Sequence, residues 1–149
     1  MSNALQAAEY FAAGHNCAQA VAMTYADKLG MTPSAAARMA SPFGGGMGRM
    51  REVCGAFSGM LMVLGALYGY EEGGTPAQQE LYARVQRLAD EFRERAGSIV
   101  CREILKNPPS DPAPTPRTEE FYRQRPCTRL VMLACELLDA FMEENPAEA

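Results

Sequence analysis

The sequence predicts an all-α protein that folds as a compact single-domain helical bundle of about six to seven helices over residues 1–149. Three observations support this fold class. Apolar residues recur at helical spacing between N-cap residues, prolines and glycines. Ala and Met are abundant and Trp is absent, a composition that favours closely packed helices over a β-sandwich. No stretch alternates apolar and polar residues for long enough to predict a strand.

The N-terminal half carries start and stop signals for four helices. Gly14 and Gly30 are stop signals, and Asn16 and Thr32 are favourable N-cap residues. Residues 43–50, FGGGMGRM, contain four glycines and are predicted to be irregular. We therefore expect helices over residues 3–13, 17–29, 33–40 and about 53–68.

The C-terminal half carries signals for three more helices. Thr75 opens a capping box, and Gly97 ends the amphipathic helix that follows it. Ser98 is the expected N-cap of a short helix, and Pro126 starts the last one. The expected helices cover residues 76–96, 99–105 and 126–142.

Two segments near the C-terminus are expected to be irregular. Residues 107–117, NPPSDPAPTPR, hold five of the ten prolines, and proline interrupts both helices and sheets. We expect this segment to be a surface loop. The tail after Asn145 is expected to be frayed, as chain ends commonly are.

Charge and hydropathy exclude two classes of partner. The net charge is −4 and the pI is near 5.1, whereas nucleic-acid phosphates are bound by a basic face, so no nucleic acid is expected. The longest apolar run, 53–68, is shorter than the ~20 residues that cross a bilayer, so no membrane span is expected. The first fifteen residues lack the basic and apolar regions of a secretion signal, and we expect a cytoplasmic protein.

Five cysteines in a chain without a secretion signal indicate thiol chemistry or metal binding rather than a framework of disulfides. Cys135 falls in the middle of the last predicted helix and is expected to be a core residue. The other four fall at predicted helix N-termini: Cys17, Cys54, Cys101 and Cys127. Free N–H groups and the helix dipole stabilise a thiolate there, so we expect their pKa values to lie below the usual ~8.5.

The spacing of these four cysteines matches no local metal-binding motif. Successive members are separated by 36, 46 and 25 residues, and no C-x-x-C pair is present. The spacing therefore predicts neither a zinc ribbon nor a ferredoxin-like site. A shared site requires the fold to bring the four together, and the alternative is that each is a small buried hydrophobic residue.

Glycines lie before and after Cys54, and we expect them to support a site there. Glycines in a loop let backbone N–H groups approach a sulfur atom or a bound cluster, and two glycines on one helix face let a neighbouring helix pack closely. The loop has neither of the common phosphate-binding glycine patterns. The supporting glycines are Gly44, Gly45, Gly46, Gly48, Gly55 and Gly59.

Three polar residues are further candidates. Arg49 and Arg51 follow the glycines, where they either neutralise a thiolate or an anionic cluster or are solvated in a loop. His15, the only histidine, lies two residues before Cys17. It is a candidate base or further ligand, and the alternative is a surface residue in a Gly-His-Asn turn.

Several motifs together resemble one known family. They are GHNCAQAV (14–21), FGGGMGR (43–49), CGAFSG (54–59), LGALYG (64–69), GSIVCREIL (97–105) and the late Cys127. In this order they resemble the redox-active protein family named for its C…CGAxxG…C…C cysteine signature. The resemblance implies that the signature cysteines are Cys17, Cys54, Cys101 and Cys127, with Cys135 outside the signature.

The resemblance also suggests a cofactor. A similar helical module forms part of the split-Soret cytochromes, where it is associated with an iron–sulfur cluster of the 2Fe–2S type. This chain has no C-x-x-C-H motif, so the c-type haem of those cytochromes is not expected.

We thus favour a site in which four converging thiolates bind an iron–sulfur cluster for electron transfer to a redox partner protein, whose identity the sequence does not indicate. A metal-free thiol–disulfide redox protein and a structural zinc-binding module are the alternatives. The sequence leaves open whether the protein is an enzyme and whether it forms a homodimer.

Overall fold

A computed structural model describes residues 1–146, and residues 147–149, most of the tail expected to fray, lie outside the described part. Over these described residues the chain is 66% helical, which confirms the all-α fold class. Over residues 1–146 the only β-type pairing is an isolated antiparallel bridge between Val53 and Val100. The helices are α1 (Asn3–Ala12), α2 (Cys17–Thr24), α3 (Pro33–Ala40), a 3₁₀ turn η1 (Ser41–Phe43), α4 (Gly44–Met47), α5 (Gly55–Tyr68), α6 (Pro76–Ala96), α7 (Cys101–Leu105), α8 (Glu119–Gln124) and α9 (Cys127–Glu144).

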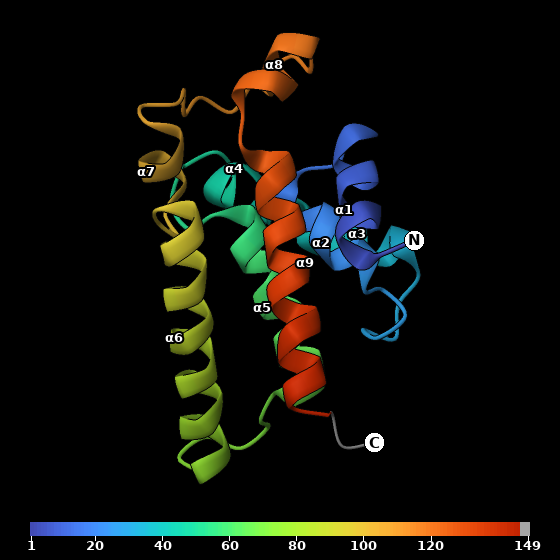
Figure 1. The fold of residues 1–149 in the computed structure, drawn as a ribbon, viewed down its shortest axis with the longest axis vertical. Helices are drawn as coiled ribbons and strands as arrows, with labels where there is room; N and C mark the ends of the chain where they lie inside the picture. Colours follow the sequence, from blue (N-terminus) through green and yellow to red (C-terminus); the bar gives the residue numbers. More distant parts are fainter. Residues whose placement is uncertain (147–149) are drawn as a thin grey trace.

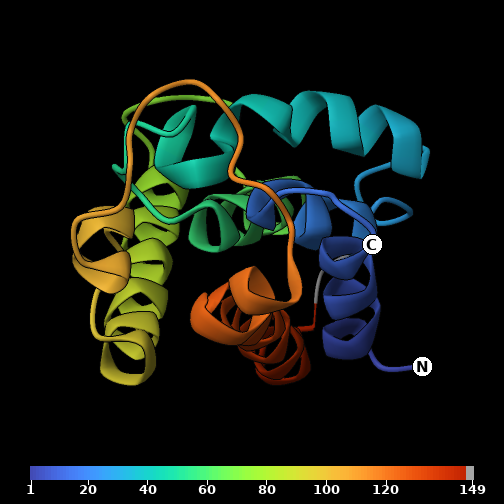
Figure 2. The same cartoon turned by 90° about the horizontal axis from the view of Figure 1, so that it is seen from above.

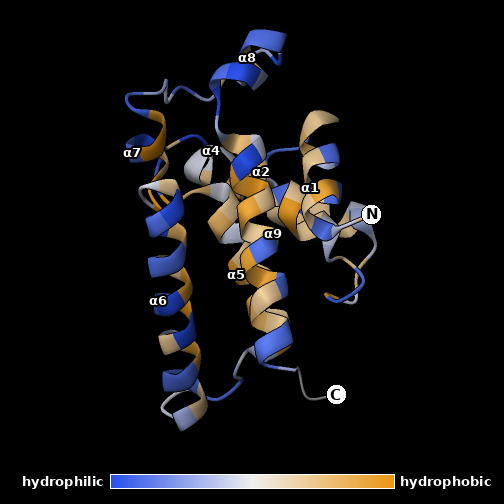
Figure 3. Ribbon diagram, in the orientation of Figure 1, coloured by the Kyte–Doolittle hydropathy of each residue, from blue (hydrophilic) through white to orange (hydrophobic). Residues whose placement is uncertain are grey.

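The long helix α9 forms the centre of the bundle. Figure 1 shows α5 behind it, α6 on one side, and α1 and α2 on the other. The helix packs against α1, α2, α5 and α6, and α3 covers the outer side of α2. The helix α6 turns its charged face outward and its apolar stripe toward α5 and α9, which is the expected amphipathic pattern (Figure 3).

The main hydrophobic core lies between these long helices. Phe57 and Phe92 meet edge-on with ring centroids 5.5 Å apart, which joins α5 to α6. A smaller cluster of alanines and Met23 joins α2 to α3. The alanine-rich surfaces let α2 approach its neighbours closely.

Most of the predicted helix starts are confirmed by their caps. Asn16 and Gln19 form a reciprocal capping box at the start of α2. The side chains of Thr32 and Thr75 accept hydrogen bonds from backbone N–H groups three residues on, with proline at the next position in both cases. Gly97 ends α6 in the left-handed conformation.

Two predicted boundaries are wrong, and one helix was not predicted. The second helix ends at Thr24 rather than near residue 29, because Tyr25 turns inward to hydrogen-bond Asp139 of α9 at 2.7 Å. Ser98 does not cap α7: its hydroxyl accepts from Val100 N, and α7 begins two residues later than expected. The short helix α8, which Thr118 caps, was not expected.

The glycine segment and the proline-rich segment, both predicted to be irregular, lie against each other. Gly45 and Gly46 have φ of 67° and 71°, so the glycine segment around α4 is irregular, as predicted. The proline-rich segment 107–117 is the predicted irregular loop, and Figure 2 shows it arching over one end of the bundle on its way from α7 to α8. Arg51 and Arg49 of the glycine segment donate to its backbone at Pro109 and Asp111.

No helix within residues 1–146 combines the length and the apolar character that a membrane crossing needs, as expected from the sequence.

Candidate functional site

The fold brings four of the five cysteines to helix N-termini at the same end of the bundle. Cys17, Cys101 and Cys127 are the first residues of α2, α7 and α9, and Cys54 is the N-cap residue of α5. The predicted placement of all four at helix starts therefore agrees with the structure. All five cysteines of the chain are free thiols.

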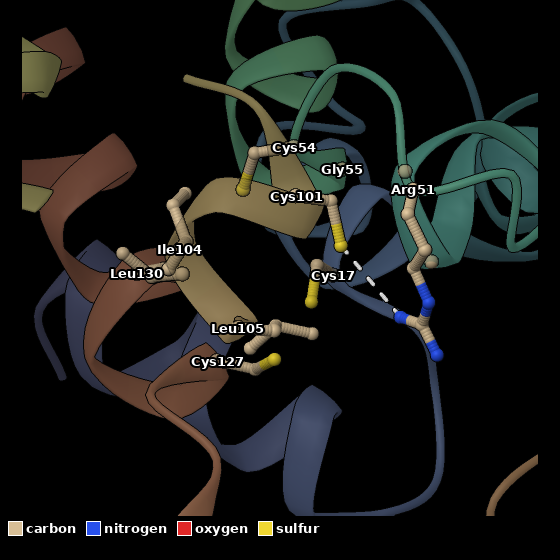
Figure 4. A pocket seen from close by; sticks show the side chains of 11 residues that line it. Cys17, Arg51, Cys54, Gly55, Cys101, Ile104, Leu105, Cys127 and Leu130 are labelled. Carbon is tan, nitrogen blue, oxygen red and sulfur yellow. Dashed lines mark hydrogen bonds between the residues drawn. The ribbon is translucent and has the colours of Figure 1, made fainter. Parts of the chain in front are cut away.

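The four cysteines line one small cavity of about 30 Å³. Figure 4 shows their sulfur atoms directed toward the same space. Cys54, Cys101 and Cys127 are buried, and Cys17 is half-buried. Apolar side chains and glycines complete the wall, and no carboxylate takes part; the remaining lining residues are Gly45, Gly46, Arg51, Gly55, Ile104, Leu105 and Leu130.

Glycine is required where the elements that carry the cysteines meet. A Cβ at Gly46 would lie 2.6 Å from Cys101 Cβ, so the glycine segment could not approach α7 with any other residue. A Cβ at Gly59 would lie 2.9 Å from Ala18 O, so α2 packs directly on α5 there. A Cβ at Gly55 would lie 3.3 Å from Cys17 Cβ. The predicted close packing of a helix against Gly55 and Gly59 is thus present, and the helix is α2.

Arg51 is a buried cation that contacts one of the four sulfur atoms. Its side chain is buried, with 4% of the residue exposed, and one terminal nitrogen donates to Cys101 Sγ at 3.6 Å (Figure 4). Its Nε donates to Pro109 O. The second terminal nitrogen, Nη2, is buried and has no hydrogen-bond partner within residues 1–146. A buried guanidinium is costly unless anions compensate it, so Arg51 favours negative charge in this region.

The prediction that all four thiols have lowered pKa values is wrong for three of them. Burial raises the pKa of Cys54 to about 12, even though the N–H groups of Phe57 and Ala56 oppose the shift. Burial also raises the pKa of Cys101, against the lowering effect of Arg51. The hydrogen bond with Cys127, followed by burial, raises the pKa of Cys17 well above its usual value. Burial thus outweighs the backbone N–H groups at Cys54 and the charge of Arg51 at Cys101, and at Cys17 it adds to the effect of the Cys127 thiol.

Cys127 differs from the other three cysteines. Its pKa is lowered, first by the hydrogen bond from Cys17 and then by the positive charges of Arg125, Arg117 and Arg51, which together outweigh burial. Cys17 is thus the proton donor of the pair, and Cys127 is the sulfur atom that ionises most readily.

The remaining candidates from the sequence lie farther from the sulfur atoms. Gly44, Gly48 and Arg49 line a larger adjoining cavity rather than the cysteine cavity. Cys135 is fully buried in the middle of α9, as predicted for a core residue. The ring of His15 packs edge-on against Tyr10, with centroids 5.9 Å apart, and His15 lines neither of these two cavities.

Arg117 and Arg125 were not singled out from the sequence. They approach Cys127 from the end of the proline-rich loop and the end of α8. After Cys17, they are the residues that lower the pKa of Cys127 most. The position of Arg125 two residues before a signature cysteine is the one signal that could have indicated it.

The donor set suits soft, thiophilic metals, because four sulfur atoms and no oxygen ligand face the cavity. Within residues 1–146 no three His, Cys, Asp or Glu side chains are close enough together to hold a single metal ion. In this arrangement the side chains therefore do not form a tetrahedral zinc site. The all-sulfur donor set also fits a two-iron cluster, for which the cavity of about 30 Å³ would have to widen.

A family comparison agrees with this site. Residues 15–141 match the family described as "Putative redox-active protein (C_GCAxxG_C_C)". The chain belongs to this family. The family name writes its central motif as G-C-A-x-x-G, whereas this chain reads C-G-A-F-S-G, with Cys54 before Gly55. Comparisons with curated proteins and with solved structures gave no match.

Proposed function

We propose that this family member is a redox protein whose four signature cysteines bind an iron–sulfur cluster of the 2Fe–2S type and serve electron transfer to a partner protein. The observation that carries the proposal is the convergence of four thiols from four separate helices on one cavity without a carboxylate. A dithiol cycle requires only two cysteines, and the fold holds all four near one another. When bound, such a cluster accepts and returns electrons at a potential that its surroundings adjust.

Charge supports the same proposal. Four thiolates make a cluster site anionic, and a buried anionic group needs compensating positive charge. Arg51 supplies it directly, through its hydrogen bond to Cys101 Sγ and its buried position. Arg117 and Arg125 add positive charge on the side of Cys127. Hydrogen bonds to cluster sulfurs raise the reduction potential, so we expect Arg51 to have that effect.

The cysteines must lose their protons when they bind metal, and this deprotonation is easier for some of them than for others. Cys127 ionises most readily, whereas the raised pKa values of Cys17 and Cys54 make their deprotonation depend on the metal itself. We therefore expect cluster binding to release protons and to weaken as the pH falls.

The test is metal and sulfide analysis of protein purified without oxygen. We expect about two irons and two sulfides for each chain, with the visible absorption of a cluster. Cys54→Ser should lose the cluster, since a serine hydroxyl stays protonated and is a poor ligand for iron. Cys135→Ser is the matched control, because it makes the same chemical change outside the cavity and should keep the cluster. Stoichiometric zinc, or a cluster that survives Cys54→Ser, would refute the proposal.

The second candidate function is a metal-free dithiol–disulfide cycle between Cys17 and Cys127. The specific observation in its favour is their placement, because Cys17 and Cys127 line both the cysteine cavity and the larger adjoining cavity, and the pKa of Cys127 is lowered. Oxidation would join the two sulfur atoms and release two electrons and two protons to an acceptor disulfide, which becomes two thiols. Metal-free protein with a Cys17–Cys127 disulfide in a peptide map after mild oxidation would select this function, and a Cys54–Cys101 disulfide would contradict the assigned pair.

A further inference from the structure

A second cavity adjoins the cysteine cavity and is much larger. Its volume is about 450 Å³, within the range of small-molecule binding sites. It shares Cys17, Cys127, Gly45 and Arg51 with the cysteine cavity. The glycine segment, the proline-rich loop and α8 form its walls, so it lies between the sulfur atoms and the outside of the bundle.

The charge of this cavity is opposite to that of the chain. Four arginines line it, and no aspartate or glutamate does, whereas the chain as a whole has a net charge of −4. The arginines are Arg49, Arg51, Arg117 and Arg125. One carboxylate is near them, that of the exposed Asp111, 3.8 Å from Arg49. Positive charge concentrated in a partly closed cavity attracts anions.

Neutral groups hold the arginines in place. Arg117 donates to the carbonyl oxygens of Phe11 and His15 and stacks over the Phe11 ring at 4.3 Å. Arg125 lies over the ring of Phe121 at 5.1 Å. Carbonyl oxygens and aromatic rings fix a guanidinium but leave its charge uncompensated. The guanidinium groups are therefore held in place with positive charge left to attract an oxyanion.

An unpartnered atom points to the same conclusion. Arg51 lines this cavity, it is almost completely buried, and its Nη2 has no hydrogen-bond partner within residues 1–146. Figure 4 shows this nitrogen directed away from Cys101, to which the other terminal nitrogen donates. Buried N–H groups almost always have an acceptor, so the chain leaves a place for one.

We propose that this arginine-lined cavity binds a small anionic molecule with carboxylate or phosphate groups, and holds it beside Cys17 and Cys127. The bound anion supplies the acceptor that Arg51 lacks and neutralises the charge of Arg117 and Arg125. The proposal does not require a cluster, because the four arginines and the unpartnered nitrogen of Arg51 carry it; a bound cluster would share the charge of Arg51, Arg117 and Arg125 with the anion. It makes the protein a binder of a small anionic ligand in addition to any partner protein.

Calorimetry on the protein as purified tests this, with pyrophosphate and tricarballylate as separate probes for phosphate and carboxylate. Binding of either supports the proposal, and the tighter one identifies the ligand class. Arg125→Gln should weaken binding about tenfold, the loss of one charged hydrogen bond, and Arg125→Lys should weaken it less. Arg38→Gln is the matched control, because it removes the same charge from the exposed surface of α3 and should leave binding unchanged.

Several results would overturn the proposal. They are no binding of either probe, equal weakening by Arg38→Gln and Arg125→Gln, and binding of an acidic peptide without binding of the small anions. Cys54→Ser separates this proposal from the cluster, because Cys54 does not line the larger cavity. That variant should lose the cluster and still bind the anion, and loss of anion binding in it would count against a distinct site.

Discussion

Replacing Gly59 with alanine tests whether the close approach of α2 to α5 positions Cys17. The added Cβ would lie 2.9 Å from Ala18 O and 3.0 Å from Val21 Cβ, both on α2. Carbon atoms essentially never approach a backbone oxygen this closely. Because a backbone atom in a helix cannot move alone, α2 must shift away from α5, and Cys17 at its first position must move with it.

Gly65 provides a matched control on the same helix. It is exposed, and a Cβ there would meet no other atom within 4 Å. Both substitutions gain the same helix propensity, about 1 kcal/mol. Only Gly59→Ala adds overpacking, which costs about 1–3 kcal/mol. The two variants should thus differ by this overpacking cost, and at roughly 2–4 °C for each kcal/mol their melting temperatures should differ by about 2–12 °C.

Thermal unfolding followed by far-UV circular dichroism measures this difference. Gly65→Ala should melt at or above the temperature of the unchanged protein, and Gly59→Ala should melt below Gly65→Ala. Cluster loading should fall in Gly59→Ala alone, because only this variant displaces Cys17. Equal melting temperatures and equal loading in the two variants would refute the argument that the second glycine of the C-G-A-x-x-G motif serves the packing of α2.

Three further predictions concern the core and its thiols. Cys135→Ser should lower the free energy of unfolding by about 1–3 kcal/mol in a urea titration, because it places a hydroxyl in a fully buried position. In the metal-free reduced protein, burial raises the pKa values of Cys54 and Cys135 to about 12, above the ~8.5 of an ordinary thiol, so the unfolded chain loses these protons first. Stability is therefore complete below about pH 8.5 and falls between about pH 8.5 and 12, by up to about 1.4 kcal/mol for each pH unit and each thiol. Urea midpoints that stay constant over this interval would contradict this prediction. Tyr25→Phe should cost about 1–3 kcal/mol, since it removes the 2.7 Å hydrogen bond to Asp139, and an unchanged urea midpoint would show that the bond contributes nothing.

The elements that local chemistry specifies could be predicted from the sequence. Asn16, Thr32 and Thr75 cap helices because their side chains bond to backbone N–H groups three residues away, an interaction contained in the local sequence. The end of α2 depends instead on Tyr25 reaching Asp139, more than a hundred residues later. No local pattern contains that contact. The start of α7 likewise depends on the pairing of Val53 with Val100.

The four cysteines that meet at the candidate site could be predicted from the sequence, but their protonation states could not. The positions of the four cysteines followed from helix caps and glycines, and the fold placed all four on one cavity. Their protonation depends on burial and on arginines that the proline-rich loop and α8 bring to Cys127. The loop contains no periodic pattern, so nothing in its sequence indicated which end of the bundle it covers.

The helix dipole is a smaller influence on these thiols than the cysteine positions suggest. At the start of α7, the N–H groups of Cys101 and Arg102 donate to Glu52 O and Arg51 O, so they are not free to stabilise a thiolate. Helix α7 has five residues, and its dipole is correspondingly short. Cys127 is the only one of the four cysteines with a lowered pKa, and it is the one that three arginines and the Cys17 thiol reach together. The Cys17 thiol first, and then the charges of three arginines, thus decide more than helix position which sulfur ionises, and the same three arginines line the proposed anion cavity.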